Sequence, residues 1–176
     1  AQLTLLDRVR IDEADKRTGH TIVPLVWELS RIVGEPHGGW VHWGATTQNI
    51  TQTGDLLVLR QAHRIFLRQI GELLAAAADL AERGADMVVP GRTHGQHAVP
   101  ATFGYKAAVW IDELERHVER LEQAAPRMFV AMLGGGAGTF ASLGKDGPPV
   151  QAGIGRHLGF GTMRVPSRAL GDHLAE

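Results

Sequence analysis

Apolar residues along this chain recur mostly every three to four positions, which is the spacing of one face of an α-helix. On this basis we expect helices over residues 3–17 and 21–33. Glycine and proline interrupt the pattern over residues 34–39, which predicts a loop there. A proline-free pattern then extends from Thr47 to Arg83 and ends at Gly84.

A third long pattern runs from Phe103 to Met128, with an apolar seam on one side and charged residues on the other. A short helix is expected near residues 149–158. The predicted fold class is therefore all-α, an elongated bundle of long helices. A helix over Thr47–Arg83 would be about 55 Å long, which exceeds what a domain of this size can cover. We therefore expect it to meet helices from other chains.

Composition narrows the classes of function. The 176 residues suffice for about one domain. The 18 Lys and Arg residues nearly balance 19 Asp and Glu residues, and the net charge of −1 argues against a nucleic-acid or membrane-surface partner. The absence of cysteine excludes a disulfide framework and a thiolate zinc site. No apolar run approaches the roughly 20 residues of a membrane span, so we expect a cytoplasmic protein.

The first group of candidate site residues lies where the longest predicted helix begins. Thr46, Thr47 and Asn49 are residue types that cap helices, and His42 and Gln48 lie among them. The free N–H groups and the positive dipole end of a helix attract a carboxylate or a phosphate. These residues therefore either only cap the helix or also bind an anion.

The second group lies in a polar, non-helical turn over residues 91–104, between the two longest helices. The guanidinium of Arg92 and the hydroxyl of Thr93 suit carboxylate binding. An imidazole with a pKa of about 6.5 is a natural proton donor or acceptor at neutral pH. His94 and His97 could be half of a metal site, but no third ligand stands at a recognisable spacing. We expect neither a metal nor another cofactor.

The third group is the glycine-rich segment over residues 133–139, which follows a strand-like apolar run. Its spacing does not fit the Gly-x-Gly-x-x-Gly pattern of dinucleotide-binding folds, and the Gly-Lys-Ser/Thr ending of a P-loop is missing. We therefore expect a tight turn that is able to cup an anion.

Together these segments resemble the fumarase/aspartase superfamily, within it the branch of adenylosuccinate lyase and 3-carboxy-cis,cis-muconate cycloisomerase. The first family signature, His-x-Gly followed by Thr-Ser-x-Asp-x-x-x-Thr, is similar to residues 42–53. The second, Gly-Arg-Thr-His-x-Gln-x-Ala-x-Pro-x-Thr-x-Gly, matches residues 91–104 without a mismatch. Residues 135–139 resemble the family's Gly-x-x-Gly-Thr turn, and His20 resembles a histidine that precedes an early helix.

The resemblance implies a homotetramer whose active sites are each assembled from three subunits. It also implies β-elimination from a succinyl-type or dicarboxylate substrate, with release of fumarate through an aci-carboxylate intermediate. His94 would protonate the leaving group, while His42 and His20 would assist at the rest of the substrate. The residues implied to bind the carboxylates or the intermediate are Thr46, Thr47, Gln48, Arg92, Thr93 and Gln96.

Several departures from the family pattern bear on activity. Asn49 replaces an aspartate, Thr47 replaces a serine, and Gly171 replaces the arginine of a later Arg-Asp-x-x-Ala-Glu pattern. The mobile loop that supplies the family's base serine is not found in the 176 residues. We expect residues 1–176 to be one partial unit, mostly the central helical-bundle domain of a longer lyase, and inactive alone.

Two alternatives stay open. The segment over residues 41–46 and the segment over 133–143 favour a lactonising cycloisomerase, whereas His94 and His20 favour a C–N lyase. An alternative of another class is a catalytically silent oligomeric scaffold, in which the helices matter and the polar loops do not. The sequence does not identify the leaving group.

Overall fold

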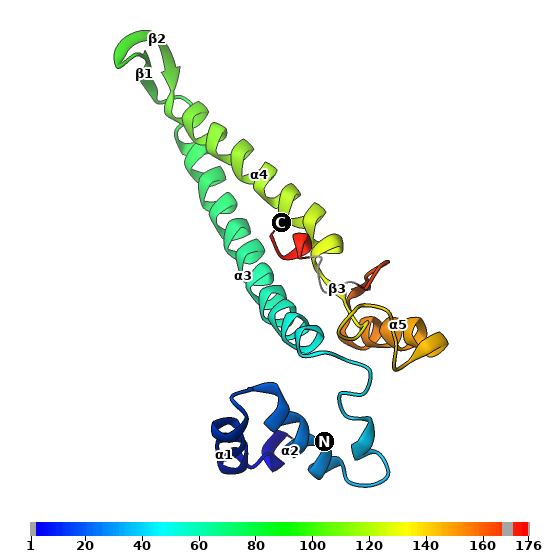
Figure 1. The fold of residues 1–176 in the computed structure, drawn as a ribbon. Helices are drawn as coiled ribbons and strands as arrows, with labels where there is room; N and C mark the ends of the chain where they lie inside the picture. Colours follow the sequence, from blue (N-terminus) through cyan, green and yellow to red (C-terminus); the bar gives the residue numbers. More distant parts are fainter. Residues whose placement is uncertain (1–2, 167–170, 176) are drawn as a thin grey trace. The chain divides into compact units, whose positions relative to one another are not determined.

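The computed structural model describes residues 3–166 and 171–175. The chain divides into two compact units, one formed by residues 1–54 and 130–171 and the other by residues 55–129 and 172–176. Helices dominate both units (Figure 1). The helix α3 begins in the first unit and continues into the second.

The first unit opens with two packed helices and ends in a small α/β cluster. Its elements are η1 (Leu3–Leu5), α1 (Arg8–Thr18), α2 (Ile22–Val33), η2 (Gly38–Trp40), the start of α3 (Thr47–Arg83), β3 (Val130–Ala131), η3 (Gly144–Asp146), α5 (Gly147–Leu158) and β4 (Gly161–Thr162). Strands β3 and β4 pair in parallel. The buried Gln151 of α5 fixes this cluster, because its amide donates to the carbonyls of Ala131 and Met163, each at 3.1 Å.

The first helix starts later than its apolar pattern predicts. The expectation of a helix over residues 3–17 is wrong at its start, because α1 begins at Arg8. The carboxylate of Asp7 accepts hydrogen bonds from the N–H groups of Val9 and Arg10 at 3.0 and 3.2 Å and so caps the helix. The helix ends where Gly19 takes a left-handed conformation, with φ of 61°.

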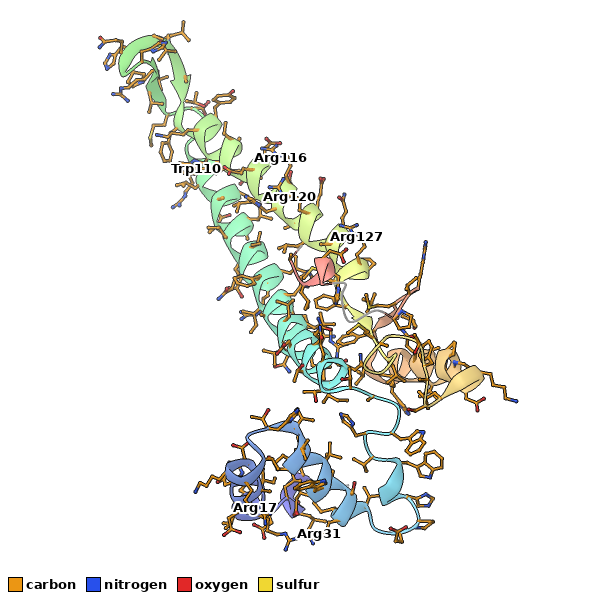
Figure 2. All side chains as sticks on the ribbon, in the orientation of Figure 1. Arg17, Arg31, Trp110, Arg116, Arg120 and Arg127 are labelled. Carbon is orange, nitrogen blue, oxygen red and sulfur yellow. The ribbon has the colours of Figure 1, made fainter. Side chains whose placement is uncertain are left out.

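The second unit is built on α3 and α4 (Phe103–Met128), two antiparallel helices joined by a β-hairpin (Figure 1). The bounds of both helices agree with those expected from the sequence. The ring Nε2 of His63 on α3 lies 3.0 Å from the carbonyl oxygen of Leu121 on α4. The short element η4 (Asp172–Leu174) packs on α4, and Arg116, Arg120 and Arg127 lie along α4 (Figure 2).

The hairpin is a structure that the helical pattern did not predict. Strands β1 (Val88–Thr93) and β2 (Gln96–Thr102) pair antiparallel, with an irregularity between Pro90 and Arg92. His94 and Gly95 form the two-residue turn and both have positive φ angles, 50° and 75°. Such turns match the twist of paired strands and favour residues that tolerate a left-handed backbone. The turn thus forms with histidine where asparagine or aspartate is usual.

Among the described residues, no helix is both long enough and apolar enough to cross a membrane.

A buried carboxylate ties the first two helices together. Glu28 on α2 is only 4% exposed, and it accepts hydrogen bonds from the Asp7 N–H at 3.0 Å and from Arg31 Nε at 2.9 Å. Arg10 of α1 lies 3.5 Å from the same carboxylate. Arg31 is seen on α2 in Figure 2. The Arg31 hydrogen bonds first, and then the Asp7 N–H, lower the pKa of Glu28 from 4.5 to about 2.

This lowered pKa predicts how stability depends on pH. The folded state holds the ionised form of Glu28, so its contribution is complete above pH 4.5 and is lost as pH falls toward 2. We expect Glu28→Gln to lower the Tm at neutral pH, with the difference from the unsubstituted chain shrinking between these two pH values. Thermal melts from pH 7 to pH 2 measure this. The exposed Glu13→Gln serves as control, and a pH-independent difference for Glu28→Gln would contradict the assignment.

Close backbone contact sets the packing of α4 against the end of α3. A Cβ atom added at Gly104 would lie 2.4 Å from the carbonyl oxygen of Ala81 and 2.8 Å from the backbone nitrogen of Ala85. The N–H of Gly104 also donates to the carbonyl of Gly84 at 2.7 Å. A side chain at position 104 would therefore force the helices apart.

We expect Gly104→Ala to lower the free energy of unfolding by about 1–3 kcal/mol, because the backbone atoms it meets cannot yield easily. Gly71→Ala is the matched control on α3, where an added Cβ meets nothing within 4 Å. That change should raise stability by about 0.5–1 kcal/mol. Urea unfolding of both variants tests the pair, and equal effects would show that position 104 is not a close contact.

Candidate functional site

The ring of His20 links the start of α2 to the start of α3. Its Nδ1 accepts hydrogen bonds from the N–H groups of Ile22 and Val23 at 3.3 and 3.4 Å. Because Nδ1 acts as acceptor, the ring proton of a neutral imidazole resides on Nε2. This Nε2 lies 3.3 Å from the hydroxyl oxygen of Thr47, the first residue of α3. The ring therefore caps one helix and donates toward the hydroxyl at the start of another.

A second side chain organises the first turn of α3. Asn49 is 2% exposed, and its Oδ1 accepts from the N–H of Thr46 at 3.0 Å and from the N–H of Gly135 at 3.2 Å. Thr46, Thr47 and Gln48 are half-buried beside it. The first unit thus gathers two threonine hydroxyls, an amide and an imidazole at the start of a long helix, which is the positive end of the helix dipole.

The glycine-rich segment is a tight turn, as its composition predicts. Gly135 and Gly138 have φ angles of 74° and 73°, and the N–H of Phe140 donates to the carbonyl of Gly134 at 3.0 Å. A Cβ at Gly135 would lie 3.2 Å from the carbonyl oxygen of Gly44. The turn is therefore held against both the first turn of α3 and the segment that leads into it.

His42 stands in the segment that leads into α3. Its backbone has a φ of 67°, unusual for a residue with a side chain. The Nε2 of its ring is buried and has no hydrogen-bond partner among the described residues. The neighbouring Trp43 donates its indole N–H to the carbonyl of Ser142 at 3.2 Å, which anchors this segment. An orphaned buried nitrogen of this kind is available to a ligand.

The predicted residues of the second motif lie on the hairpin of the other unit. Arg92, Thr93, His94 and Gln96 are all exposed there. Arg92 Nη2 lies 3.5 Å from Nε2 of His97. The left-handed turn at His94 places this histidine at the end of the hairpin. These four side chains thus share one short segment, and the His20, His42, Thr46, Thr47 and Gln48 set belongs to the first unit.

No group of three or more His, Asp or Glu side chains among the described residues is arranged to hold a metal ion.

Sequence reasoning missed the part that Asn49 plays. From sequence, Asn49 is a capping residue type that lacks the charge of the family's aspartate, whereas the structure shows a buried acceptor that joins two segments 86 residues apart. A local signal was present, because a polar residue three positions after a capping threonine often bonds back to the N–H of that threonine. The bond to Gly135 left no local signal.

Several known proteins are similar to this chain. A family described as Lyase matches residues 2–174. An adenylosuccinate lyase of Pyrococcus abyssi is 37% identical over 161 residues, covering 92% of this chain and 36% of that protein. An N-acetyl-S-(2-succino)cysteine lyase of Dickeya dadantii is 34% identical over 176 residues, covering 100% of this chain and 38% of that protein.

A 3-carboxy-cis,cis-muconate cycloisomerase of Pseudomonas aeruginosa is 38% identical over 175 residues, covering 98% of this chain and 38% of that protein. Among solved structures, a fumarate lyase from Mesorhizobium sp. BNC1 has 41% identity and a TM-score of 0.88, over 96% of this chain and 40% of that one. The chain thus spans little more than a third of the length of the curated relatives it matches.

These matches confirm the resemblance drawn from residues 42–53 and 91–104, and they confirm the long-helix fold class. A family match over residues 2–174 covers nearly every residue, including both units and the two groups of polar side chains. The chain therefore belongs to this lyase family.

Proposed function

We propose that this chain belongs to an enzyme that performs β-elimination on a succinyl-type substrate and releases fumarate, most like adenylosuccinate lyase. The names of two relatives support a succinyl group in the proposed substrate. One refers to adenylosuccinate and the other to a succinylated cysteine, so the group next to the succinyl differs while the succinyl itself is shared. Residues common to such enzymes would act on the shared group.

The contact between His20 and Thr47 carries the proposal. It brings an imidazole N–H and a hydroxyl, 3.3 Å apart, to the start of α3, which is the positive end of the helix dipole. A carboxylate accepts several such hydrogen bonds at once, and the positive end of the helix dipole favours its charge. Thr46, Thr47 and Gln48 would hold one carboxylate of the succinyl group, assisted by His20 and His42.

The hairpin supplies the second half of the chemistry in this proposal. The Arg92 guanidinium binds a carboxylate in bidentate fashion, and Thr93 and Gln96 offer further hydrogen bonds. The described residues offer the His94 ring no hydrogen bond, so its imidazole is available to a substrate. His94 in its protonated form is the acid of the reaction.

The proposed elimination proceeds in two steps. A general base removes the proton from the carbon next to one carboxylate, and the electron pair moves into that carboxylate to give an aci-carboxylate. Preorganised donors stabilise the additional negative charge. The bond from the adjacent carbon to nitrogen then breaks as its electron pair leaves with the nitrogen, which takes a proton from His94, and fumarate departs. None of the residues named above is assigned the role of the base.

A homotetramer with shared active sites is part of this proposal. The helices of the second unit carry apolar side chains that this chain leaves exposed, as expected if they meet other subunits. These residues are Val58, Ile65, Phe66, Leu73, Val109 and Trp110. The tetramer and the cytoplasmic location stay predictions.

A lactonising cycloisomerase is the second candidate. The relative of that name is 38% identical over 98% of this chain, a similarity as high as that of the lyases. The product distinguishes the two reactions, because an elimination releases fumarate whereas lactone closure releases nothing. Fumarate formation followed by absorbance, with succinylated amines as substrates, decides between them.

We expect His94→Ala in the natural gene product to lower kcat for elimination by about 10²- to 10⁴-fold, the range for loss of a general acid. His97→Ala, on the same hairpin and equally exposed, is the matched control and should have a much smaller effect. Steady-state kinetics measure both. If the kcat of His94→Ala stays within a few-fold of that of the unsubstituted protein, His94 is not the acid.

Thr47→Val tests the carboxylate site. Loss of the hydroxyl that faces His20 should weaken fumarate binding about tenfold, since a hydrogen bond to a charged group is lost while the volume is kept. The Tm should change little. Isothermal titration with fumarate and a thermal melt measure the two effects, with exposed Thr51→Val as control. A large fall in Tm at unchanged affinity would instead identify Thr47 as a helix cap alone.

A further inference from the structure

His42 has a backbone conformation that its surroundings must maintain. Its φ of 67° lies in the left-handed region, which histidine adopts rarely, and such residues persist only where neighbouring contacts fix them. The Nε2 atom of its ring is buried and has no hydrogen-bond partner among the described residues. A buried ring nitrogen of this kind costs free energy unless a ligand supplies the missing bond. The two observations together indicate that His42 is held in place for a ligand.

One loop contacts both of the residues that follow His42. The indole N–H of Trp43 donates to the carbonyl of Ser142 at 3.2 Å. Gly44 has a φ of 72°, and a Cβ atom added there would lie 2.6 Å from Cγ of Leu143 and 2.7 Å from its Cδ1. The side chain of Leu143 therefore packs directly on the backbone of Gly44. A different backbone conformation in this segment would lose both the hydrogen bond and the packing contact.

This loop, over residues 140–143, is fixed by its own turn and by α5. The N–H groups of Leu143 and Gly144 both donate to the carbonyl of Phe140, at 2.8 and 2.7 Å. The ring of Phe140 packs on Gly147, the first residue of α5, because a Cβ atom added at Gly147 would overlap with the ring. The loop therefore offers a fixed surface to the segment that contacts it.

We propose that Trp43 and Leu143 are positioning residues for His42, which hold its backbone in the left-handed conformation and so direct its buried Nε2 toward the substrate. This inference rests on the proposed function, in which His42 assists in binding the substrate. Trp43 and Leu143 themselves do not touch the substrate. Their contacts order the segment before binding, so the substrate does not have to supply the free energy of ordering it.

The experiment measures fumarate release by the natural gene product from two substrates that the relatives' names state, adenylosuccinate and N-acetyl-S-(2-succino)cysteine. Leu143→Ala removes the side chain that packs on Gly44, and it should lower kcat/KM about tenfold because His42 is then misplaced. Trp43→Phe keeps a ring but removes the N–H donor, and it should lower kcat/KM about threefold. Leu143→Met keeps the volume and should retain most of the activity.

Double-mutant cycles separate positioning from a general structural role. If Trp43 and Leu143 act through His42, the same changes made together with His42→Ala should lower kcat/KM further by less than about twofold. A merely structural role would lower kcat/KM by the same factor in both backgrounds. Trp40→Phe makes the same change on the neighbouring ring, which is 67% exposed, and as the matched control it should leave kcat/KM unchanged.

A second measurement, made without substrate, keeps the test independent of turnover. Diethylpyrocarbonate modifies accessible imidazole nitrogens, and mass spectrometry of the peptides gives a reaction rate for each histidine. His42 should react slowly in the unsubstituted protein because its Nε2 is buried. Leu143→Ala and Trp43→Phe should raise this rate about threefold or more, since local opening exposes the ring. The exposed His37 is the internal control, and its rate should not change.

The outcomes are distinguishable. If kcat/KM is unchanged in both variants, or falls equally together with His42→Ala, the positioning role is overturned. An unchanged diethylpyrocarbonate rate of His42 in both variants shows that Trp43 and Leu143 do not hold it. Absence of fumarate release from both substrates by the unsubstituted protein overturns the proposed function itself, while the diethylpyrocarbonate rates still decide whether the two side chains hold His42.

Discussion

The need to satisfy free N–H groups at the start of a long helix governs the first unit. The first N–H groups of an α-helix lack the usual intrahelical carbonyl partners, and at the start of α3 a side chain supplies one of the partners. Asn49 bonds to the N–H of Thr46, and the ring of His20 approaches Thr47. The same polar side chains that lie at the start of α3 are the ones that a carboxylate would use in the proposed function. In the proposed function, helix capping and anion binding would be two uses of one arrangement.

In the second unit, a close backbone contact fixes how the two long helices pack. Gly104 brings α4 against the carbonyl of Ala81, and its N–H bonds to Gly84. This fixes the helices at the base of the hairpin, from which β1 and β2 extend. The hairpin itself needs few contacts, because paired strands and a left-handed two-residue turn define its shape. Exposed polar side chains on such an element are well suited to a ligand or to another subunit.

The sequence predicted the elements whose physics is local. Helices α3 and α4 were found with their bounds because a proline-free apolar period runs unbroken through each. The start of α1 was misplaced because the apolar period extends to residues before Asp7, although the capping carboxylate of Asp7 marks where the helix begins. The hairpin was missed because its strands are short, rich in glycine and proline, and joined by His94 and Gly95 instead of an asparagine turn.

The candidate site shows the same difference between residues with a local sequence signal and residues with long-range contacts. Thr46 and Thr47 were predicted to lie at a helix start because capping residues and helix starts are adjacent in sequence, whereas the role of Gln48 came from the family resemblance. His20 was connected to them only through the family resemblance, since the 27 residues between it and Thr47 carry no spacing signal. The bond from Asn49 to Gly135 crosses 86 residues and could be found only in three dimensions.

The proposed assignment of the carboxylate to one group of residues and of the acid to another would account for how related proteins differ in the group attached to the succinyl. In the proposed reaction the donors of the first unit would bind a carboxylate, and the hairpin carries the proposed acid; among the described residues, Nε2 of His42 has no hydrogen-bond partner. A succinyl group needs the same hydrogen bonds whatever atom it is attached to. The group attached to the succinyl differs between the relatives' names, adenylosuccinate in one and a succinylated cysteine in the other, and it would change only what the proposed acid must protonate. In the proposed reaction, a constant demand on the carboxylate-binding residues and a variable demand on the acid follow from the chemistry of the substrate.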